Sequence, residues 1–399
     1  MDRDTIRDWL GLKHNVIILF TVILVLGMGE ELWIQFVPKY LEALGASVLI
    51  IAIYGSLKEL LDAVYQYPGG WLADRMGRRR ALILFALLSI FGYLIYLFTP
   101  DWHWILIGIF FVMAWSSLTS PAIFAIIGDN LPQNRRAISF GMQSILKRIP
   151  IVIAPLLGGW IMGRIGLISG IHLGLIVTLF LAFLSIFVVK HYYTEKTKLE
   201  YKKESLGDIW RNMSPALKRL LLTDCLARWA AGIPKVFIIL YIINTLGGSE
   251  FQFGQLISVR MLTSIIVYIP IAKLADRTNR KPFVLLTFTF FALFPLSLSV
   301  APSLIWLFPA FIIAGLREIG EPARKAMIVD LSSPTCRGRA VGMYYLIRGL
   351  VVFPASLIGG LLWTIEPQIT FYVAFIIGMT GVIVFALWGP DLVPKSDVI

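Results

Sequence analysis

Charged residues are scarce in this chain. Asp, Glu, Lys and Arg make up 15% of its 399 residues, whereas 58% are hydrophobic. A soluble domain carries about a quarter charged residues, so this scarcity excludes an ordinary soluble fold. Apolar runs near the roughly 20 residues that cross a bilayer recur throughout the chain. The composition therefore predicts a helical membrane protein with several spans.

Cysteine and histidine are also rare. The two cysteines, Cys225 and Cys336, are too few for a disulfide framework or a metal cluster, so we expect both to be reduced thiols. The four histidines fall near span ends or in loops, which does not favour a proton relay through them. The sequence shows no phosphate-binding Gly-Lys loop and no nucleophile–base pair. We therefore expect no enzyme, no metal site and no other cofactor.

Basic residues outnumber acidic ones, with 36 Lys and Arg against 24 Asp and Glu. Most of them fall in alternate loops and at the termini, whereas Lys39 and Arg164 lie near the opposite side. This asymmetry is typical of cytoplasmic loops. It predicts a multi-pass protein of the cell (cytoplasmic) membrane with both termini in the cytoplasm. It also accounts for the positive charge without nucleic acid as a partner.

Twelve hydrophobic segments are predicted to span the bilayer. The longest hydrophilic stretch follows the sixth segment, and its mixed charge is typical of a cytoplasmic linker that is partly an amphipathic helix. We expect a six-helix bundle over residues 1–190, a linker over 191–216 and a second six-helix bundle over 217–399. The expected spans are 16–40, 47–67, 81–99, 103–127, 137–162, 167–190, 217–244, 252–272, 282–301, 303–328, 339–364 and 367–389.

A short basic stretch divides the chain into two related halves. Residues 69–80 read Gly-Gly-Trp-Leu-Ala-Asp-Arg-Met-Gly-Arg-Arg-Arg. They are predicted to form a loop, with two glycines that allow a tight exit from the preceding helix. Part of this stretch returns in the second half, and chance similarity of apolar segments would not keep Asp, Pro and Gly in step. The matched positions are Asp74 with Asp276, Arg75 with Arg277, Pro121 with Pro322, Asp129 with Asp330, and Gly158-Gly159 with Gly359-Gly360.

Residues 70–79 resemble the signature that the major facilitator superfamily carries between spans two and three, and the resemblance covers essentially the whole chain. It implies an all-α polytopic membrane protein with twelve transmembrane helices in two pseudo-symmetric six-helix bundles around a central cavity, working by alternating access. The chain is most similar to the twelve-span drug and metabolite efflux branch. Span five carries part of the antiporter signature, at Gly141, Pro155, Gly158 and Gly159, whereas span four lacks the Arg usual in drug–proton antiporters.

Ionisable side chains inside spans usually face the bundle interior or a water-filled cavity. The resemblance implies that spans one, four, seven and ten line this cavity. A carboxylate there can load and release a proton, and an Arg can hold a carboxylate or phosphate group. The residues expected to bind the substrate or the proton are Glu30, Glu31, Arg228, Arg317, Glu318 and Glu321.

Spacing adds detail in span ten. Glu318 and Glu321 are three residues apart and should share a helical face, and Arg317 should be able to pair with Glu321. Arg324 and Lys325 are expected near the lipid headgroups or the gate. The alternative for every buried charge is a structural lock between helices. A second set, open to the lock and the substrate-binding interpretations, consists of Lys58, Glu59, Arg148, Arg260 and Arg348.

The basic stretch also predicts a cytoplasmic gate. The resemblance puts Asp74 against the N-terminus of span eleven, where the helix dipole favours an anion. Arg75 and Arg78 could pair with Asp129 at the end of span four. The alternative, that the basic residues only set the orientation, explains the arginines but not Asp74. The expected gate residues are Gly70, Asp74, Arg75, Gly77, Arg78, Asp129, Asp276, Arg277 and Asp330.

Together these features predict a secondary active transporter that moves a small organic solute, is coupled to protons and works in the direction of efflux. We expect a monomer in the lipid bilayer. The buried arginines leave open a symporter that takes up an anionic or zwitterionic metabolite. A membrane sensor that retains the transporter fold is an alternative of another class, but it would need a cytoplasmic output domain, for which the linker is short.

Overall fold

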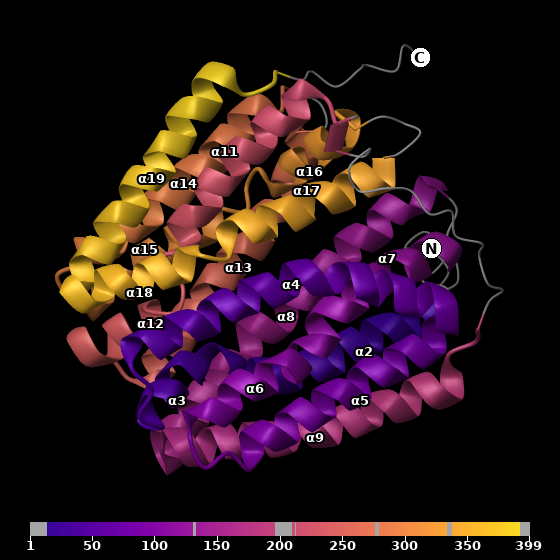
Figure 1. Cartoon of the computed structure of the whole chain (residues 1–399), viewed down its shortest axis with the longest axis horizontal. Coiled ribbons are helices and arrows are strands. Elements are labelled where there is room, and N and C mark those ends of the chain that lie inside the picture. Colours follow the sequence, from indigo (N-terminus) through magenta and orange to yellow (C-terminus); the bar gives the residue numbers. More distant parts are fainter. Residues whose placement is uncertain are drawn as a thin grey trace. The chain divides into compact units, whose positions relative to one another are not determined.

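The computed structural model describes residues 14–130, 133–195, 210–211, 213–275, 279–332 and 337–391. Within these ranges it leaves out the side chains of residues 124–125, 128–130, 133–142, 269, 272–273, 275 and 337–339. Every regular element in the described ranges is helical, and the elements join into twelve successive helical segments, as predicted (Figure 1). Eight of the segments are long and apolar enough, by length and composition, to cross a membrane.

The elements follow one another as a simple series, and most connections between segments are short. In chain order they are α2 (His14–Glu31), η1 (Ile34–Phe36), α3 (Val37–Ala43), α4 (Val48–Met76), α5 (Arg78–Leu97), α6 (Trp102–Met113), η2 (Ala114–Leu118), α7 (Thr119–Asn130), α8 (Gln133–Ile165), α9 (Leu167–Tyr192), α11 (Pro215–Gly232), α12 (Ile238–Leu240), η3 (Tyr241–Thr245), α13 (Glu250–Ala275), α14 (Lys281–Ser299), η4 (Leu304–Trp306), α15 (Leu307–Leu316), α16 (Glu321–Asp330), α17 (Arg337–Val352), α18 (Ala355–Ile365) and α19 (Pro367–Trp388).

Contacts between residues divide the chain into two compact units. The described part of the first unit lies within 14–46, 60–195 and 249–255, and that of the second within 47–59, 210–248 and 256–391. Helices α4 and α13, which correspond to each other in the repeat, therefore each belong partly to one unit and partly to the other. The residue boundaries expected for the two bundles and the linker stay a prediction, since most of the linker lies outside the described residues.

In the first unit α2 packs against α8 and α9, and α5 packs against α6 and α9. The closest approach in this unit is at Gly158 of α8, where a Cβ atom would lie only 1.9 Å from the backbone oxygen of Leu32. No larger residue fits there without moving the backbone. This contact is the physical reason for one glycine of the antiporter-like pattern in span five.

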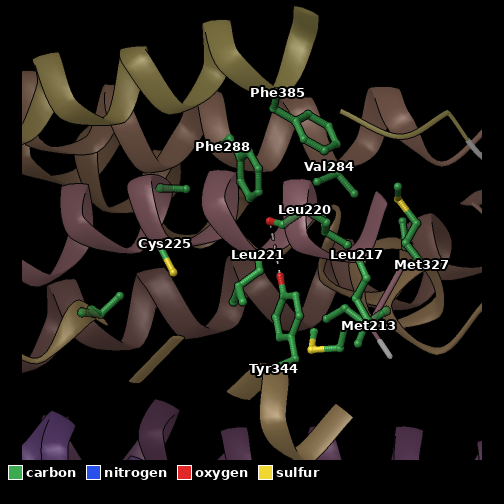
Figure 2. Packing of buried hydrophobic residues seen from close by; sticks show 14 of the residues in the cluster. Met213, Leu217, Leu220, Leu221, Cys225, Val284, Phe288, Met327, Tyr344 and Phe385 are labelled. Atoms are coloured by element: carbon green, nitrogen blue, oxygen red, sulfur yellow. Dashed lines mark hydrogen bonds between the residues drawn. The ribbon is translucent and has the colours of Figure 1, made fainter. Parts of the chain in front are cut away.

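In the second unit α19 lies along α14 and α11, and α17 packs against α11. Buried apolar side chains from these helices form the core that Figure 2 shows, with Leu217 and Leu220 of α11 close to Phe288 of α14 and Phe385 of α19. Lipid is as apolar as such a core, so close van der Waals packing rather than exclusion of water stabilises it. The thiol of Cys225 is buried here and free, as expected, whereas Cys336 lies outside the described residues.

Segments one, four, seven, ten and eleven are interrupted, each near a proline. Proline cannot donate a backbone hydrogen bond, and its ring clashes with the carbonyl group four residues earlier. In segment four that earlier residue falls in the π-helical turn η2, before Pro121. In segment ten it falls in the break between α15 and α16, before Pro322. Membranes tolerate irregular backbone only where protein buries it or where it lines a water-filled cavity, so we expect these breaks to face away from lipid.

The basic stretch is not the loop that was expected. Helix α4 continues to Met76 and α5 begins at Arg78, so Gly77 alone separates them. Its φ of 90° is a conformation that residues with a side chain rarely adopt. Gly69 lies inside α4, where a Cβ atom would be 2.3 Å from the backbone oxygen of Leu118. The prediction failed because this glycine serves close helix packing rather than a turn.

Candidate functional site

The second unit contains a buried cluster of charged side chains centred on Asp224 of α11. Asp224 and Arg324 of α16 are each 1% exposed and form an ion pair. The Oδ2 atom of Asp224 also accepts hydrogen bonds from the Tyr344 hydroxyl at 2.9 Å and from Nη1 of Arg348 at 3.3 Å, both on α17. Its Oδ1 atom lies 3.7 Å from Nε of Arg228. One carboxylate therefore joins α11, α16 and α17.

Glu321, the first residue of α16, is the second carboxylate of this cluster. Its two oxygens accept hydrogen bonds from Nη2 of Arg324 at 2.8 and 2.7 Å. Nη2 of Arg228 lies 3.4 Å from Oε2, and Nζ of Lys325 lies 3.6 Å from Oε1. The cluster thus holds the two carboxylates of Asp224 and Glu321 against four cations, an excess of two positive charges when all are ionised.

Three predictions about span ten were wrong. Arg317 does not pair with Glu321, and Glu318 and Glu321 do not share a regular helical face, because α15 ends at Leu316 and α16 begins at Glu321. Spacing rules for a continuous helix do not hold across such a break. Arg324 was expected near the headgroups or the gate, yet it is buried between Asp224 and Glu321. The pairing with two carboxylates is what allows a charged group to be buried there.

Arg317 lies in the break itself and faces aromatic rings. Its guanidinium carbon is 4.9 Å from the ring centroid of Phe291 and 5.1 Å from that of Phe294, both on α14. Its Nε atom donates a hydrogen bond of 2.9 Å to the carbonyl oxygen of Ala314. The guanidinium carbon of Arg228 is also 4.9 Å from the Phe291 centroid. Phe291 therefore contacts two arginines.

In the first unit Glu30 is buried at the end of α2, with 8% of its surface exposed. The hydroxyl of Tyr93 donates a hydrogen bond of 2.5 Å to its Oε1 atom. The Tyr93 ring meets the indole of Trp33 edge-on, at 5.9 Å between centroids. Glu31 instead accepts a hydrogen bond of 2.8 Å from Gln35, on the next turn of its own segment. The two adjacent glutamates thus have different surroundings. Nothing in the sequence indicated that Tyr93 would donate a hydrogen bond to Glu30.

Two members of the second predicted set form ion pairs. Glu59 of α4 pairs with Lys235, which follows α11, and the lysine side chain is 51% exposed. Arg348 pairs with Asp224. Lys58, beside Glu59 in the sequence, is half-buried. The lock interpretation is therefore supported for Glu59 and Arg348.

The other two members of that set lie on α8 and α13. Nη1 of Arg148 donates a hydrogen bond of 3.3 Å to the backbone oxygen of Ser144 on its own helix. Arg260 is half-buried, and its backbone oxygen lies 2.5 Å from where a Cβ atom on Gly315 would stand. Helices α13 and α15 therefore pack closely at Arg260. The contacts of Arg148 and Arg260 do not assign a role to either arginine.

The four histidines lie near helix ends, as expected. His14 begins α2, His103 is the second residue of α6, His172 is in the second turn of α9 and His191 is near its end. His103 donates to Oδ1 of Asp101 through its ring Nδ1 and through its backbone N–H, both at 2.9 Å. These hydrogen bonds lower the pKa of the exposed Asp101 carboxyl, and the hydrogen bond from the His103 ring has the largest effect. The positions of the histidines in the sequence therefore do not point to the buried carboxylates of the site.

Comparison with known proteins decides the family. The sequence profile of the Major Facilitator Superfamily matches residues 19–230 and 220–399. The chain belongs to this superfamily. An uncharacterized MFS-type transporter of Methanocaldococcus jannaschii, MJ1317, is 23% identical over 370 residues, which cover 90% of this chain and 91% of that one. The multidrug resistance protein MdtG of Escherichia coli is 24% identical over 401 residues, with 96% and 94% covered.

Solved structures confirm the superfamily fold. A POT family transporter, crystallised in complex with a thioalcohol-conjugated peptide, superposes with a TM-score of 0.76 at 15% identity and covers 93% of this chain and 94% of its own. The expected fold, twelve helices in the arrangement of the superfamily, is therefore confirmed. The protein is an integral membrane protein and a secondary transporter of small molecules, not an enzyme.

The superfamily signature contains the first half of the predicted gate. Nη1 of Arg78, the first residue of α5, lies 2.5 Å from Oδ1 of Asp74 in the last turn of α4, so the pair crosses the break at Gly77. The guanidinium of Arg75 lies 5.1 Å from the indole ring of Trp71. Arg78 was expected to pair with Asp129, whose side chain is outside the described residues. The gate role of these residues stays a prediction.

The second copy of the signature shows a related pair. Asp330 forms an ion pair with Arg280, which corresponds to Arg78 by the offset that relates Asp74 to Asp276. Asp276 and Arg277 lie outside the described residues. Gly70 lies inside α4, where a Cβ atom would be 3.5 Å from the Pro121 ring.

Glu195 contributes to the first signature in a way that the sequence did not reveal. Its two carboxylate oxygens accept hydrogen bonds from the backbone N–H groups of Arg78 at 2.8 Å and Arg79 at 2.9 Å. These are the first two residues of α5, so Glu195 caps this helix. Next to it, Thr194 and Asn15 exchange two hydrogen bonds, of 2.9 and 3.1 Å. The residues after α9 are therefore bound to the N-termini of α2 and α5.

Proposed function

We propose that this protein is a proton-coupled transporter that exports a small organic solute by alternating access, and that the cluster around Asp224 and Glu321 binds the solute and the proton. The observation that carries the proposal is the sharing of two buried carboxylates among four cations. Each carboxylate has more than one cationic partner, so a proton or a solute can replace one partner while others remain. A ligand drives a conformational change only through different affinities for the two states, and exchangeable partners supply that difference.

The two carboxylates differ in access. The Asp224 side chain is 1% exposed, whereas that of Glu321 is 12% exposed and adjoins Lys325, which is 46% exposed. A group that loads and releases protons must reach water. The cations around Glu321 disfavour its protonation in this arrangement, so we assign to Glu321 the proton of a state in which Arg228 and Lys325 have moved away from it, and a structural role to Asp224. Glu30 is the candidate in the first unit, because its buried carboxylate has the Tyr93 hydroxyl as a neutral hydrogen-bond donor.

Outward movement is supported by similarity. The Escherichia coli relative is named a multidrug resistance protein, which favours export. Gly158 and Gly159 of the antiporter-like pattern both lie where a Cβ atom would strike backbone oxygens, those of Leu32 and Glu250. These contacts give the glycines of the antiporter-like pattern a packing role, which supports the proposal of export. We further propose that one chain is the transporting unit.

A second candidate function is uptake of an anionic or zwitterionic metabolite by proton symport. The excess of cations over carboxylates in the cluster favours it, because an acidic solute would neutralise that excess. Export and uptake make opposite predictions for the same flux measurement.

Reconstituted vesicles test both functions. A ligand from a solute screen, found by its effect on thermal stability, is loaded with a pH gradient imposed in either direction. In export by antiport the solute moves against the proton flow, whereas in symport it moves with it. Glu321→Gln should abolish the response to pH while exchange of solute without a gradient continues. Glu366→Gln is the matched control, because Glu366 is an exposed carboxylate between α18 and α19 and takes no part in the cluster. Absence of solute movement under every gradient would show that the proposal is wrong.

A further inference from the structure

Arg317 is a cation that forms no ion pair with a carboxylate of the described residues, and the charge of the adjacent Glu318 acts on it only from a longer distance. None of their Asp or Glu oxygens lies within 4.0 Å of its guanidinium, and its Nε atom donates to a backbone oxygen, that of Ala314. Arg324, seven residues later, pairs with both Asp224 and Glu321. The half-buried Arg317 is therefore positioned by its neighbours, and its charge is only partly offset, since Glu318 acts on it at a distance together with the like charges of Arg260 and Arg228.

The rings of Phe291 and Phe294 attract the guanidinium without changing its net charge. A cation–π contact is weaker than an ion pair, and an uncompensated charge at this depth in a membrane protein is costly. Such charges in membrane proteins mark sites of substrate or ion passage. A second positive charge makes the case stronger, because Arg228 contacts the same Phe291 ring.

The geometry limits how far apart the two arginines lie. Each guanidinium carbon is 4.9 Å from the centroid of Phe291, so the two cannot be separated by more than twice that distance. Like charges this close repel each other strongly where water is scarce. Arg228 pairs with Asp224 and Glu321, but these two carboxylates are shared with Arg324, Arg348 and Lys325, so they only partly offset this repulsion.

We propose that Arg317 and Arg228 bind the acidic group of an organic anion, a carboxylate or a phosphate, and that the apolar part of that anion lies against Phe291 and Phe294. The inference rests on the proposed function, because it takes this anion to be the transported solute. Both arginines present flat, forked sets of N–H donors, which match the two oxygens of a carboxylate or phosphate. The rings beside them would contact an aromatic or aliphatic body.

Probes that differ only in charge test the proposal on the purified full chain. One series is 3-phenylpropionate, its amide and 3-phenylpropylamine, and phenyl phosphate adds the second acidic group. We expect the two anions to bind at least ten-fold more tightly than the amide, and the amine not to bind measurably. If neither anion binds, or if the amide or the amine binds more tightly, the proposal is wrong.

Variants assign the binding to these residues. Arg317→Met should weaken binding of the anions at least ten-fold and leave that of the amide unchanged, and Arg317→Lys should fall between, since an ammonium lacks the fork. Arg219→Met is the control, because it removes one positive charge from an exposed position on α11. Without ligand, Arg317→Met should be at least as stable to heat as the natural protein, because an uncompensated charge is gone. A less stable variant with unchanged anion affinity would instead show a structural role and overturn the proposal.

Two further arms separate other sources of the signal. If phosphatidylglycerol co-purifies with the natural protein, is lost in Arg317→Met and is not displaced by either anion, the site holds a lipid headgroup and the substrate assignment fails. In reconstituted vesicles, movement of a cationic or neutral solute without anion binding would refute this inference and leave the transport function standing. Anion binding that depends on Arg317, without flux of any solute, would refute the transport function and leave the site standing.

Discussion

The hydroxyl of Tyr344 donates a hydrogen bond of 2.9 Å to the Oδ2 atom of Asp224. The Tyr344 ring lies in the apolar core of the second unit, and its hydroxyl points toward α11, where the Leu220 oxygen is 3.5 Å away (Figure 2). The tyrosine therefore connects the packing of α17 with the charge cluster. An ionised carboxylate only accepts hydrogen bonds, and Tyr344 gives that of Asp224 a neutral donor in addition to the charged arginines.

Tyr344→Phe should destabilise the second unit. It leaves the ring in place but removes a donor from a buried carboxylate, which costs about 1–3 kcal/mol. Thermal unfolding of the purified protein measures the effect. Tyr345→Phe is the control, since the Tyr345 ring contacts the guanidinium of Arg348 at 4.6 Å and keeps that contact without its hydroxyl. Equal losses in both variants would contradict the role given to the Tyr344 hydroxyl.

Arg324→Gln should be much more harmful than Arg348→Gln. Arg324 is 1% exposed and forms the shortest ion pair of each carboxylate in the cluster, so its loss leaves both buried carboxylates with more distant partners, at up to about 3–5 kcal/mol. Arg348 is 21% exposed and contributes a single hydrogen bond of 3.3 Å to Asp224. The yield of monodisperse protein and its unfolding temperature provide the comparison. A similar outcome for the two variants would mean that Arg324 is not the central cation of the cluster.

Gly158→Ala should damage the protein, whereas Gly163→Ala should not. A Cβ atom at Gly158 would stand 1.9 Å from the Leu32 oxygen, so the backbones of α8 and the segment after α2 must separate. At Gly163, on the same helix, a Cβ atom would meet nothing within 4 Å, and alanine there favours the helix by about 0.5–1 kcal/mol. Unfolding temperature and solute flux measure both variants. Normal flux and stability in Gly158→Ala would disprove the close contact.

Glu195→Ala should loosen the start of α5 without unfolding the bundle. Loss of a helix cap costs about 0.5–2 kcal/mol, and the Glu195 side chain is exposed, so the effect should stay local. Hydrogen exchange should accelerate at the amides of Arg78 and Arg79, which donate to this carboxylate. Glu195→Gln keeps an acceptor oxygen and should give an intermediate rate. Unchanged exchange at both amides would rule out the cap.

Several features of the fold followed from the sequence. The twelve segments, the repeat and the family signature were all readable, because each depends on residues that are neighbours in the chain or recur at a constant offset. The interruptions were not predicted, although Pro121 and Pro322 were noted as a matched pair. A proline within a span does not by itself decide the outcome, since α8 keeps Pro150 and Pro155 inside an unbroken helix.

The candidate site was predicted only in part. Arg228, Arg317 and Glu321 were identified because ionisable groups in spans are few and costly. Asp224 was overlooked, and Arg324 was assigned to the wrong environment, because the significance of each depends on the other across 100 residues. The expected pair of Arg317 with Glu321 failed at the break between α15 and α16, where helical spacing no longer sets distance.

The sequence by itself determined that this protein is a twelve-helix transporter of the major facilitator type, since hydropathy, repeat and signature are properties of the linear chain. Only the tertiary structure decided which charges neutralise each other. Ion pairing depends on distance and burial, and residues such as Asp224 and Arg324 meet only when helices far apart in the chain are packed. The same arrangement leaves Arg317 beside aromatic rings instead of a carboxylate, and that placement points to the chemistry of the solute.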